Sequence, residues 1–364
     1  MAIRVDRRSF LVSIPAVLAA HRLIAQGGPP QIRVNGLSQL TLTVSDPKRS
    51  IEFYQGLFGM PVQARQGTTT FLRIGAGPRF LAIVPAGPGE RPSISRFGMG
   101  VEQFDVDNIL KILAQHGVTP ADPANTTSAS GGPMKVRVVT RGNTREMFVG
   151  DTAGIVFQLH DVSYCGGGGP LGNMCQPEPA PTKGLLAVKD MSHFTVGSPS
   201  AQFYADVFGM PVQAMQATTP AYGVGPGVHF LMFTGGGGGA RGTAPGGAVP
   251  GGGAAGGRGG APAAAGGRGG GAPAVAAIDH ACMSLDNFVP EAVTKTLTGF
   301  GIKPGARSDG ALVTYISLRM ENRGGAPVTG TPELYFTDPD GLAIQLQDTK
   351  YCGGGGYLGD ICPG

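Results

Sequence analysis

Several features that define common protein classes are missing from this 364-residue sequence. After the N-terminal segment, no apolar run approaches the ~20 residues of a membrane-spanning helix. No C-x2-C pair with a nearby histidine indicates a structural zinc site, and no strand–P-loop–helix pattern indicates a phosphate site. The net charge of only +4 argues against a dedicated nucleic-acid-binding protein. We therefore expect no nucleic-acid partner and no membrane span in the mature protein.

The first thirty residues have the layout of an export signal. A charged start is followed by an apolar run from Phe10 to Ala20, too short to span a bilayer stably, and then by small residues. Arg7 and Arg8, with Ser9-Phe10-Leu11 behind them, resemble the twin-arginine signal of bacteria. An ordinary Sec signal or a lipid-facing anchor is the alternative. We expect residues 1–30 to direct export, which makes the mature protein periplasmic or extracellular.

Cysteine is scarce, and four of the five cysteines bound two copies of one phrase. We call YCGGGGPLGNMC at 164–175 the first clasp and YCGGGGYLGDIC at 351–362 the second clasp. In an exported protein such cysteines favour disulfides. Closure within each clasp is the simplest of the three pairings, since four glycines let the chain turn back tightly, and bridges between the clasps are the alternative. The cysteines predicted to pair are Cys165, Cys175, Cys352 and Cys362.

Glycine is unusually abundant, with 63 residues beside 30 prolines. Residues 235–276 contain glycine, alanine, proline, arginine, threonine and valine, with no acidic or aromatic residue. Such a composition cannot bury enough apolar surface to offset its ordering entropy. Residues 256–260 and 266–270 resemble RNA-contacting RGG segments, but three arginines without an aromatic residue favour a disordered linker.

The clasp occurs twice because most of the chain is duplicated. The heptapeptide FGMPVQA occupies 58–64 and again 208–214, and IVFQLHD at 155–161 matches LAIQLQD at 342–348. Each copy divides into two units of the order βαβββ, judged from apolar alternation and helical spacing. The main elements expected are strands at 37–44, 69–74, 79–84, 94–104, 134–140, 146–150, 154–159, 277–288, 312–320 and 333–348, and helices at 48–58, 108–117 and 290–301.

This organisation resembles the vicinal oxygen chelate superfamily of glyoxalases, bleomycin-resistance proteins and extradiol dioxygenases. The most recognisable motifs are FYQGLFGMPV at 53–62 and DPDG at 338–341. The resemblance covers residues 36–162 and 187–350. It implies an α+β fold of two tandem domains, each with two βαβββ modules curled around a cavity that usually holds a divalent metal. The domain arrangement is completed by a clasp and linker at 163–186 and by a clasp at 351–364.

The resemblance also marks metal-ligand positions on the first and last strands of the modules. In the first domain these positions hold Gln39, Arg96 and Gln158. An arginine cannot ligate a cation and would repel one. We therefore expect the first domain to have lost its metal site.

In the second domain the same positions hold His193, His280 and Gln345. Two imidazoles and an oxygen ligand resemble the 2-His-1-carboxylate triad of non-haem iron oxygenases, which extradiol dioxygenases carry in the second of two domains. Gln345 stands where glutamate is expected, and a family histidine before Leu334 is missing. A neutral amide should bind Fe2+, Zn2+ or Mn2+ more weakly than a carboxylate. His229, near the end of the third unit, is a further candidate ligand.

Other polar side chains have weaker signals. Tyr335 is the candidate catalytic residue, because it could orient a substrate oxygen or assist proton transfer; packing on its strand is the alternative. Cys282 shares a strand face with His280 and either lines the cavity or packs as a buried apolar residue. We expect His160 to lie at the surface, His116 in a helix and His21 in the signal segment.

Two functions of different classes follow. In the first, the chain is a dioxygenase- or lyase-like metal enzyme that chelates two neighbouring oxygens of a small substrate, with extradiol-type cleavage favoured. In the second, it is a non-catalytic protein that sequesters a small molecule, as bleomycin-resistance proteins do. The paired histidines favour the enzyme, whereas the missing glutamates favour the binding protein.

Overall fold

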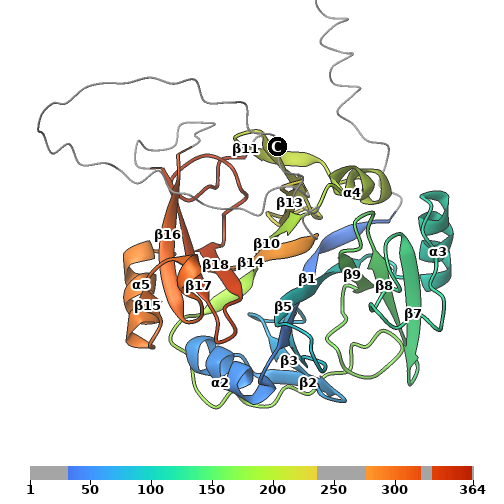
Figure 1. The fold of residues 1–364 in the computed structure, drawn as a ribbon, viewed down its shortest axis with the longest axis horizontal. Helices are drawn as coiled ribbons and strands as arrows, with labels where there is room; N and C mark the ends of the chain where they lie inside the picture. Colours follow the sequence, from blue (N-terminus) through green and yellow to red (C-terminus); the bar gives the residue numbers. More distant parts are fainter. Residues whose placement is uncertain (1–31, 236–275, 321–329, 363–364) are drawn as a thin grey trace, which may run out of the picture.

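The computed structural model describes residues 32–235, 276–320 and 330–362 of the chain. These residues form two nine-stranded mixed sheets, one for each copy of the sequence repeat (Figure 1). The expected export signal lies outside the described residues, and so does the glycine-rich insert apart from its two ends, Gly235 and Ala276. Among the described residues, no helix is long and apolar enough to cross a membrane.

The two sheets have the same strand order, β2-β3-β4-β1-β5-β9-β8-β7-β6 and β11-β12-β13-β10-β14-β18-β17-β16-β15. This identity confirms the duplication and the α+β fold of two tandem domains. The sequence pattern did not indicate the two-residue strands β6 and β15. The first sheet contains β1 (Val34–Val44), β2 (Val62–Gln66), β3 (Thr69–Arg73), β4 (Phe80–Pro85), β5 (Ser93–Val101), β6 (Thr119–Pro120), β7 (Lys135–Arg141), β8 (Thr144–Gly150) and β9 (Val156–Asp161). The second contains β10 (Val188–Gly197), β11 (Val212–Gln216), β12 (Thr219–Gly223), β13 (Phe230–Phe233), β14 (Ala277–Leu285), β15 (Lys303–Pro304), β16 (Val313–Arg319), β17 (Thr331–Thr337) and β18 (Ala343–Asp348).

The repeated tripeptide FGM lies at the C-terminal end of the first helix of each domain. Gly59 follows α2 (Pro47–Phe58) and Gly209 follows α4 (Ala201–Phe208), with φ of 66° and 62°. This left-handed conformation favours glycine at a helix C-terminus. A Cβ on Gly59 would also lie only 2.3 Å from a backbone oxygen of the linker between the domains. The remaining helices are α3 (Val106–Gln115), α5 (Pro290–Gly299) and the short 3-10 helix η1 (Arg307–Asp309).

The apolar faces of α2 and α4 pack on the sheet of the other domain. The ring of Phe58 in α2 lies 6.0 Å from that of Phe336 in β17, between centroids. The ring of Phe208 in α4 lies 5.8 Å from that of Phe157 in β9. Aromatic side chains bury large apolar areas, and those of both domains belong to one continuous hydrophobic core. Each of these two helices therefore packs against the sheet of the domain to which it does not belong.

The DPDG turn joins the domains as well. Asp338 accepts hydrogen bonds from two backbone N–H groups of its own turn and from the hydroxyl of Tyr54, on α2, at 3.2 Å. Asp151, its counterpart in the first copy, accepts a hydrogen bond from the hydroxyl of Tyr204, on α4, at 3.4 Å. The two most recognisable family motifs thus meet across the domain interface.

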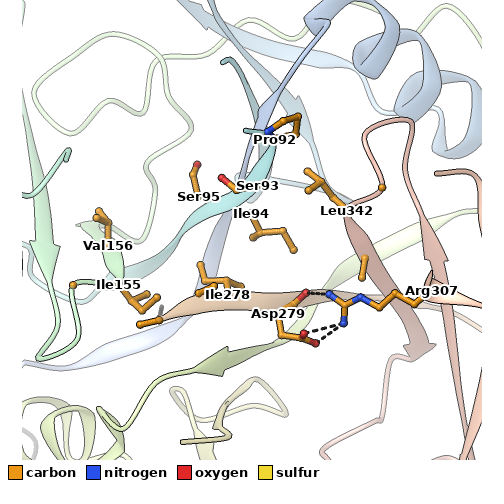
Figure 2. A pocket seen from close by; sticks show the side chains of 15 residues that line it. Pro92, Ser93, Ile94, Ser95, Ile155, Val156, Ile278, Asp279, Arg307 and Leu342 are labelled. Atoms are coloured by element: carbon orange, nitrogen blue, oxygen red, sulfur yellow. Dashed lines mark hydrogen bonds and ion pairs between the residues drawn. The ribbon is translucent and has the colours of Figure 1, made fainter. Parts of the chain in front are cut away.

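A pocket of about 410 Å³ opens on the seam between the domains (Figure 2). Its lining pairs residues from the two copies, such as Ile94 of β5 and Ile278 of β14. At one side Arg307 lies against Asp279, with two nitrogen–oxygen distances of 2.8 and 2.9 Å. Since Asp279 precedes His280, this ion pair connects the seam to one of the candidate metal ligands.

Candidate functional site

The candidate ligands of the second domain converge on one face of its sheet. We call this the inner face; the opposite face contributes to the shared hydrophobic core. His193 of β10 is paired with Cys282 of β14, and Cys282 is paired with Gln345 of β18. The Nε2 atom of His193 lies 3.1 Å from Oε1 of Gln345, and the rings of His193 and His280 are 5.5 Å apart between centroids. All three ligand candidates are buried.

His280 is held in one orientation by its neighbour. Its Nδ1 lies 2.8 Å from Oδ2 of Asp279. Burial raises the pKa of Asp279, but hydrogen bonds from His280 and Arg307 outweigh it and lower this pKa to about 2. Asp279 is therefore a carboxylate that accepts a hydrogen bond from Nδ1–H. The Nε2 atom of His280 is buried and has no hydrogen-bond partner among the described residues, so its lone pair is available on the inner face.

His193 is a neutral imidazole. Burial, and next the nearby His280, lower its pKa well below the ordinary value. Its ring stacks on Phe230 of β13 at 4.3 Å. A metal ligand must present an unprotonated nitrogen, and the environment of His193 favours that state. The Nε2 atom of Gln345 is also buried without a partner in the described part of the chain.

The donor set fits a divalent transition metal. Two imidazole nitrogens and an amide oxygen are ligand types that Zn2+, Fe2+ and Mn2+ accept, and the unpartnered Nε2 of His280 faces them. Within residues 32–235, 276–320 and 330–362, no three histidine, cysteine, aspartate or glutamate side chains gather closely enough to hold a metal. The third member of this group is an amide, so any bound ion would meet no negatively charged ligand here.

Two further sequence candidates lie beside the group, and one lies away from it. The ring of Tyr335 is 5.2 Å from that of His280, and burial raises the pKa of the Cys282 thiol well above its ordinary value. His229 faces the domain interface instead. Its Nδ1 accepts a hydrogen bond from the backbone N–H of Leu37 at 3.1 Å, and its Nε2 lies 3.4 Å from Asp190. The structure therefore does not bring His229 into the group.

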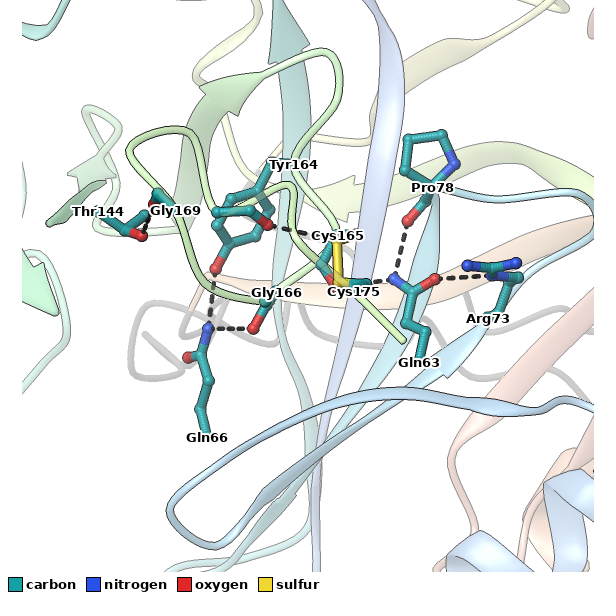
Figure 3. The surroundings of a disulfide bond; sticks show 12 residues. Gln63, Gln66, Arg73, Pro78, Thr144, Tyr164, Cys165, Gly166, Gly169 and Cys175 are labelled. Atoms are coloured by element: carbon teal, nitrogen blue, oxygen red, sulfur yellow. Dashed lines mark hydrogen bonds between the residues drawn. A yellow bond between two sulfur atoms is a disulfide. The ribbon is translucent and has the colours of Figure 1, made fainter. Parts of the chain in front are cut away.

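Each clasp covers the inner face of its own sheet. Tyr351, which opens the second clasp, is 1% exposed, and its ring lies 5.5 Å from His193. In the first domain the ring of Tyr164 stacks 4.4 Å from that of His160, and Figure 3 shows Tyr164 beside the disulfide of the first clasp. The disulfides join Cys165 to Cys175 and Cys352 to Cys362. Closure within each clasp, the simplest of the predicted pairings, is therefore confirmed.

A duplicated polar network anchors the clasps. The Tyr351 hydroxyl donates to Glu333 at 3.0 Å, and Arg319 binds both Glu333, at 3.0 Å, and the carbonyl of Gly354, at 2.6 Å. The first domain repeats this arrangement with Tyr164, Glu146, Arg141 and Gly167. Sequence reasoning missed this network. A signal was present, because the glutamate precedes the clasp tyrosine by 18 residues in both copies.

The first domain carries different side chains at the ligand positions. Thr41 is paired with Arg96 and Thr195 with His280, so the two are structurally equivalent. His160 was expected at the surface, and this prediction is wrong. Its side chain is 1% exposed, because the clasp tyrosine covers it. Burial lowers the pKa of His160 to about 4.

These domains have recognisable relatives. The family model of the Glyoxalase/Bleomycin resistance protein/Dioxygenase superfamily matches residues 36–159. The first domain belongs to this superfamily. The second domain repeats its strand order, so the chain is a tandem of glyoxalase-superfamily folds. No curated protein matches the chain.

Solved structures extend the likeness in fold to both domains of the chain. A catechol 2,3-dioxygenase is 12% identical, with a TM-score of 0.52 over 86% of this chain and 88% of that one. The Mn(II)-bound glyoxalase from Novosphingobium aromaticivorans is 12% identical, with a TM-score of 0.53 over 90% and 83%. A variant of homoprotocatechuate 2,3-dioxygenase from B. fuscum is 14% identical, with a TM-score of 0.51 over 88% and 73%. At such identities the likeness shows the fold alone.

Proposed function

We propose that the second domain binds a divalent metal ion through His193, His280 and Gln345, and acts on a small oxygen-bearing substrate as an extradiol-dioxygenase-like enzyme. The observation that carries the proposal is the convergence of these side chains from three adjacent strands. His193 and Gln345 lie 3.1 Å apart, while the buried Nε2 of His280 has no partner among the described residues. The similar structures, which are a catechol 2,3-dioxygenase, a homoprotocatechuate 2,3-dioxygenase variant and a Mn(II)-bound glyoxalase, support the same class.

The surrounding residues suit this role. A bound divalent ion supplies Lewis-acid chemistry toward neighbouring substrate oxygens. Asp279 keeps the proton of His280 on Nδ1 through their 2.8 Å hydrogen bond, which leaves Nε2 free. Phe230 and Tyr351 form an apolar wall beside His193 and exclude water from it. The Tyr335 hydroxyl donates to Glu333 at 3.2 Å, so it holds a proton beside the site.

Metal analysis of the purified protein tests the proposal. We expect about one divalent ion per chain in the wild type, and in the Gln39→Ala variant, whose substitution lies at the equivalent position of the first domain. We expect His193→Ala and His280→Ala to lose the ion, since each removes a nitrogen ligand. Unchanged metal content in both histidine variants would overturn the proposal.

A second candidate function rests on a different observation. None of the three donors carries a negative charge, and the clasp tyrosine covers the face on which they lie. These features also suit a non-catalytic protein that sequesters a small molecule without metal. A wild-type protein that takes up no metal but binds a small ligand on its inner faces would support this alternative.

We also propose that the protein is exported. The support is the N-terminal sequence together with two disulfides, which persist in oxidising compartments. Mass spectrometry of protein from a periplasmic or secreted fraction should find both clasps oxidised. Protein confined to the cytoplasm with four free clasp thiols would contradict this proposal.

A further inference from the structure

Arg96 presents an uncompensated positive charge on the inner face of the first domain. It stands in β5 at the position that His280 occupies in the second domain. Its guanidinium carbon lies 5.5 Å from the ring centroid of Phe148, on β8. The Nε atom is buried without a hydrogen-bond partner in the described part of the chain. No hydrogen bond or ion pair to any described residue involves the terminal nitrogens either, although the side chain as a whole is partly exposed.

Such a charge is costly unless something pairs with it. A desolvated cation loses hydration that only an anion or several acceptors can replace. Burial lowers the pKa of Arg96, which reflects this cost, while the nearby Tyr164 and Glu146 act in the opposite direction. Arg319 in the second domain shows the usual solution for a buried arginine, since it lies 3.0 Å from Glu333.

The acid that acts on the pKa of Arg96, Glu146, already has other partners. Glu146 already accepts hydrogen bonds from Arg141, at 2.9 Å, and from Tyr164, at 2.7 Å. The other two positions equivalent to metal ligands hold Gln39 and Gln158, which are neutral amides. The charge of Arg96 is therefore left to solvent or to an anion from solution.

The chemistry around Arg96 selects the kind of anion. The guanidinium carbon lies over the aromatic ring of Phe148, and the terminal N–H groups have no partner among the described residues. A guanidinium edge matches a planar carboxylate with two parallel hydrogen bonds. Phe148 offers an apolar surface for an organic group beside it. Glu146 acts on the same face and disfavours a doubly charged anion such as phosphate.

We propose that the inner face of the first domain is a binding site for a small organic carboxylate that pairs with Arg96. The position shared by Arg96 and His280 then has a different role in each domain. In the second domain it holds an imidazole, and in the first it holds a cation that recognises an anion. This site does not depend on metal binding in the second domain.

Titration with benzoate, acetate and inorganic phosphate tests the site. The protein used is the full-length His193→Ala variant in the presence of a chelator, so that no carboxylate binds through a metal in the second domain. Isothermal titration should show saturable benzoate binding that Arg96→Met weakens at least tenfold. The matched control Arg91→Met removes an exposed arginine and the same charge, and it should leave benzoate affinity unchanged.

Thermal unfolding supplies an independent test of benzoate binding. Benzoate should raise the melting temperature of the His193→Ala protein and of its Arg91→Met control, but not that of the Arg96→Met variant. Without benzoate, Arg96→Met should be at least as stable as its parent, because it removes an unpaired charge. In NMR spectra, benzoate should shift one arginine Nε–H signal that is absent from the Arg96→Lys variant.

Several results would overturn the proposal. These are the absence of saturable binding of both carboxylates, equal benzoate affinity in the Arg96→Met protein, and equal weakening by Arg91→Met. Tighter binding of phosphate than of benzoate would overturn the assigned ligand chemistry. If Arg96→Met does not fold, Arg96→Lys keeps the charge but loses the planar edge, and unaltered benzoate affinity in that variant would contradict the site.

Discussion

At the scale of single residues, Gln345 is the proposed metal ligand on which the strength of binding should depend most. Its side chain lies 3.1 Å from His193 and contributes no charge. Gln345→Glu should tighten divalent metal binding at least tenfold, because it adds an anion to two neutral ligands. Competition with a chromogenic chelator measures this affinity. Gln158→Glu, at the equivalent position of the first domain, is the matched control and should change nothing in the second domain. A Gln345→Glu protein that binds metal no more tightly than the wild type would contradict this role.

Asp279 should act on the metal through His280. Replacement by asparagine keeps the shape but removes the carboxylate that orients the imidazole. Carboxylates that hydrogen-bond to a ligand histidine typically contribute about 10–100-fold to metal affinity, so Asp279→Asn should weaken binding by about that factor. Asp190→Asn is the matched control, since Asp190 also contacts an arginine and a histidine, outside the proposed site. Equal metal affinities of the two variants would show that Asp279 has only a structural role.

His160 should make the protein sensitive to acid. Its pKa in the folded protein is about 4, below the ordinary value of about 6.5, so the unfolded chain takes up the proton first. The stability contributed by the neutral imidazole is complete above about pH 6.5 and is lost as pH falls through 4.

The matched substitution is His160→Gln, because Gln347 occupies the corresponding place in the second copy. Between pH 7 and pH 4.5, the free energy of unfolding should fall by roughly 2–3 kcal/mol more in the wild type than in His160→Gln. Urea denaturation at the two pH values measures this difference. Parallel losses in both proteins would mean that His160 is not the group responsible.

At the scale of elements, each clasp packs against the inner face of the sheet in its own domain. Each is closed by a disulfide across 10 residues and anchored by a tyrosine, a glutamate and an arginine. Replacing both Cys352 and Cys362 by serine should lower the free energy of unfolding by about 2–4 kcal/mol, mainly because the unfolded chain is freed.

The same change at Cys165 and Cys175 should have an effect of the same size, since the two clasps have the same loop length and anchors. Denaturant unfolding under non-reducing conditions measures both. An unchanged stability for either pair of substitutions would show that its disulfide does not hold the clasp in place.

Much of this organisation could be predicted from the sequence, because duplicated sequence segments adopt the same structure. The repeat identified two domains, and the ligand positions on first and last strands identified His193, His280 and Gln345. The placement of the clasp could not be predicted, since a glycine-rich loop has no periodicity that assigns it to a face. The burial of His160 follows from that placement, so it was missed for the same reason.

At the scale of the whole molecule, the domains depend on one another. α2 and α4 pack on the partner sheets, Tyr54 binds Asp338, and the core is continuous. The sequence predicted a helix at 48–58, but not that the sheet of the other domain packs against it. The outer faces are used in this way, and the proposed ligand sites lie on the inner faces, beside the clasp tyrosines. One inner face presents two imidazoles, and the other presents a guanidinium.

The proposed metal site is tested most directly by anomalous diffraction from crystals of the full-length protein grown with Mn2+. A peak is predicted in the second domain, at roughly 2.0–2.2 Å from Nε2 of both His193 and His280, with the Gln345 oxygen completing the protein ligands. No peak is predicted beside Arg96. The absence of a peak between the two histidines in protein shown to be correctly folded, or a peak in the first domain alone, would contradict the account.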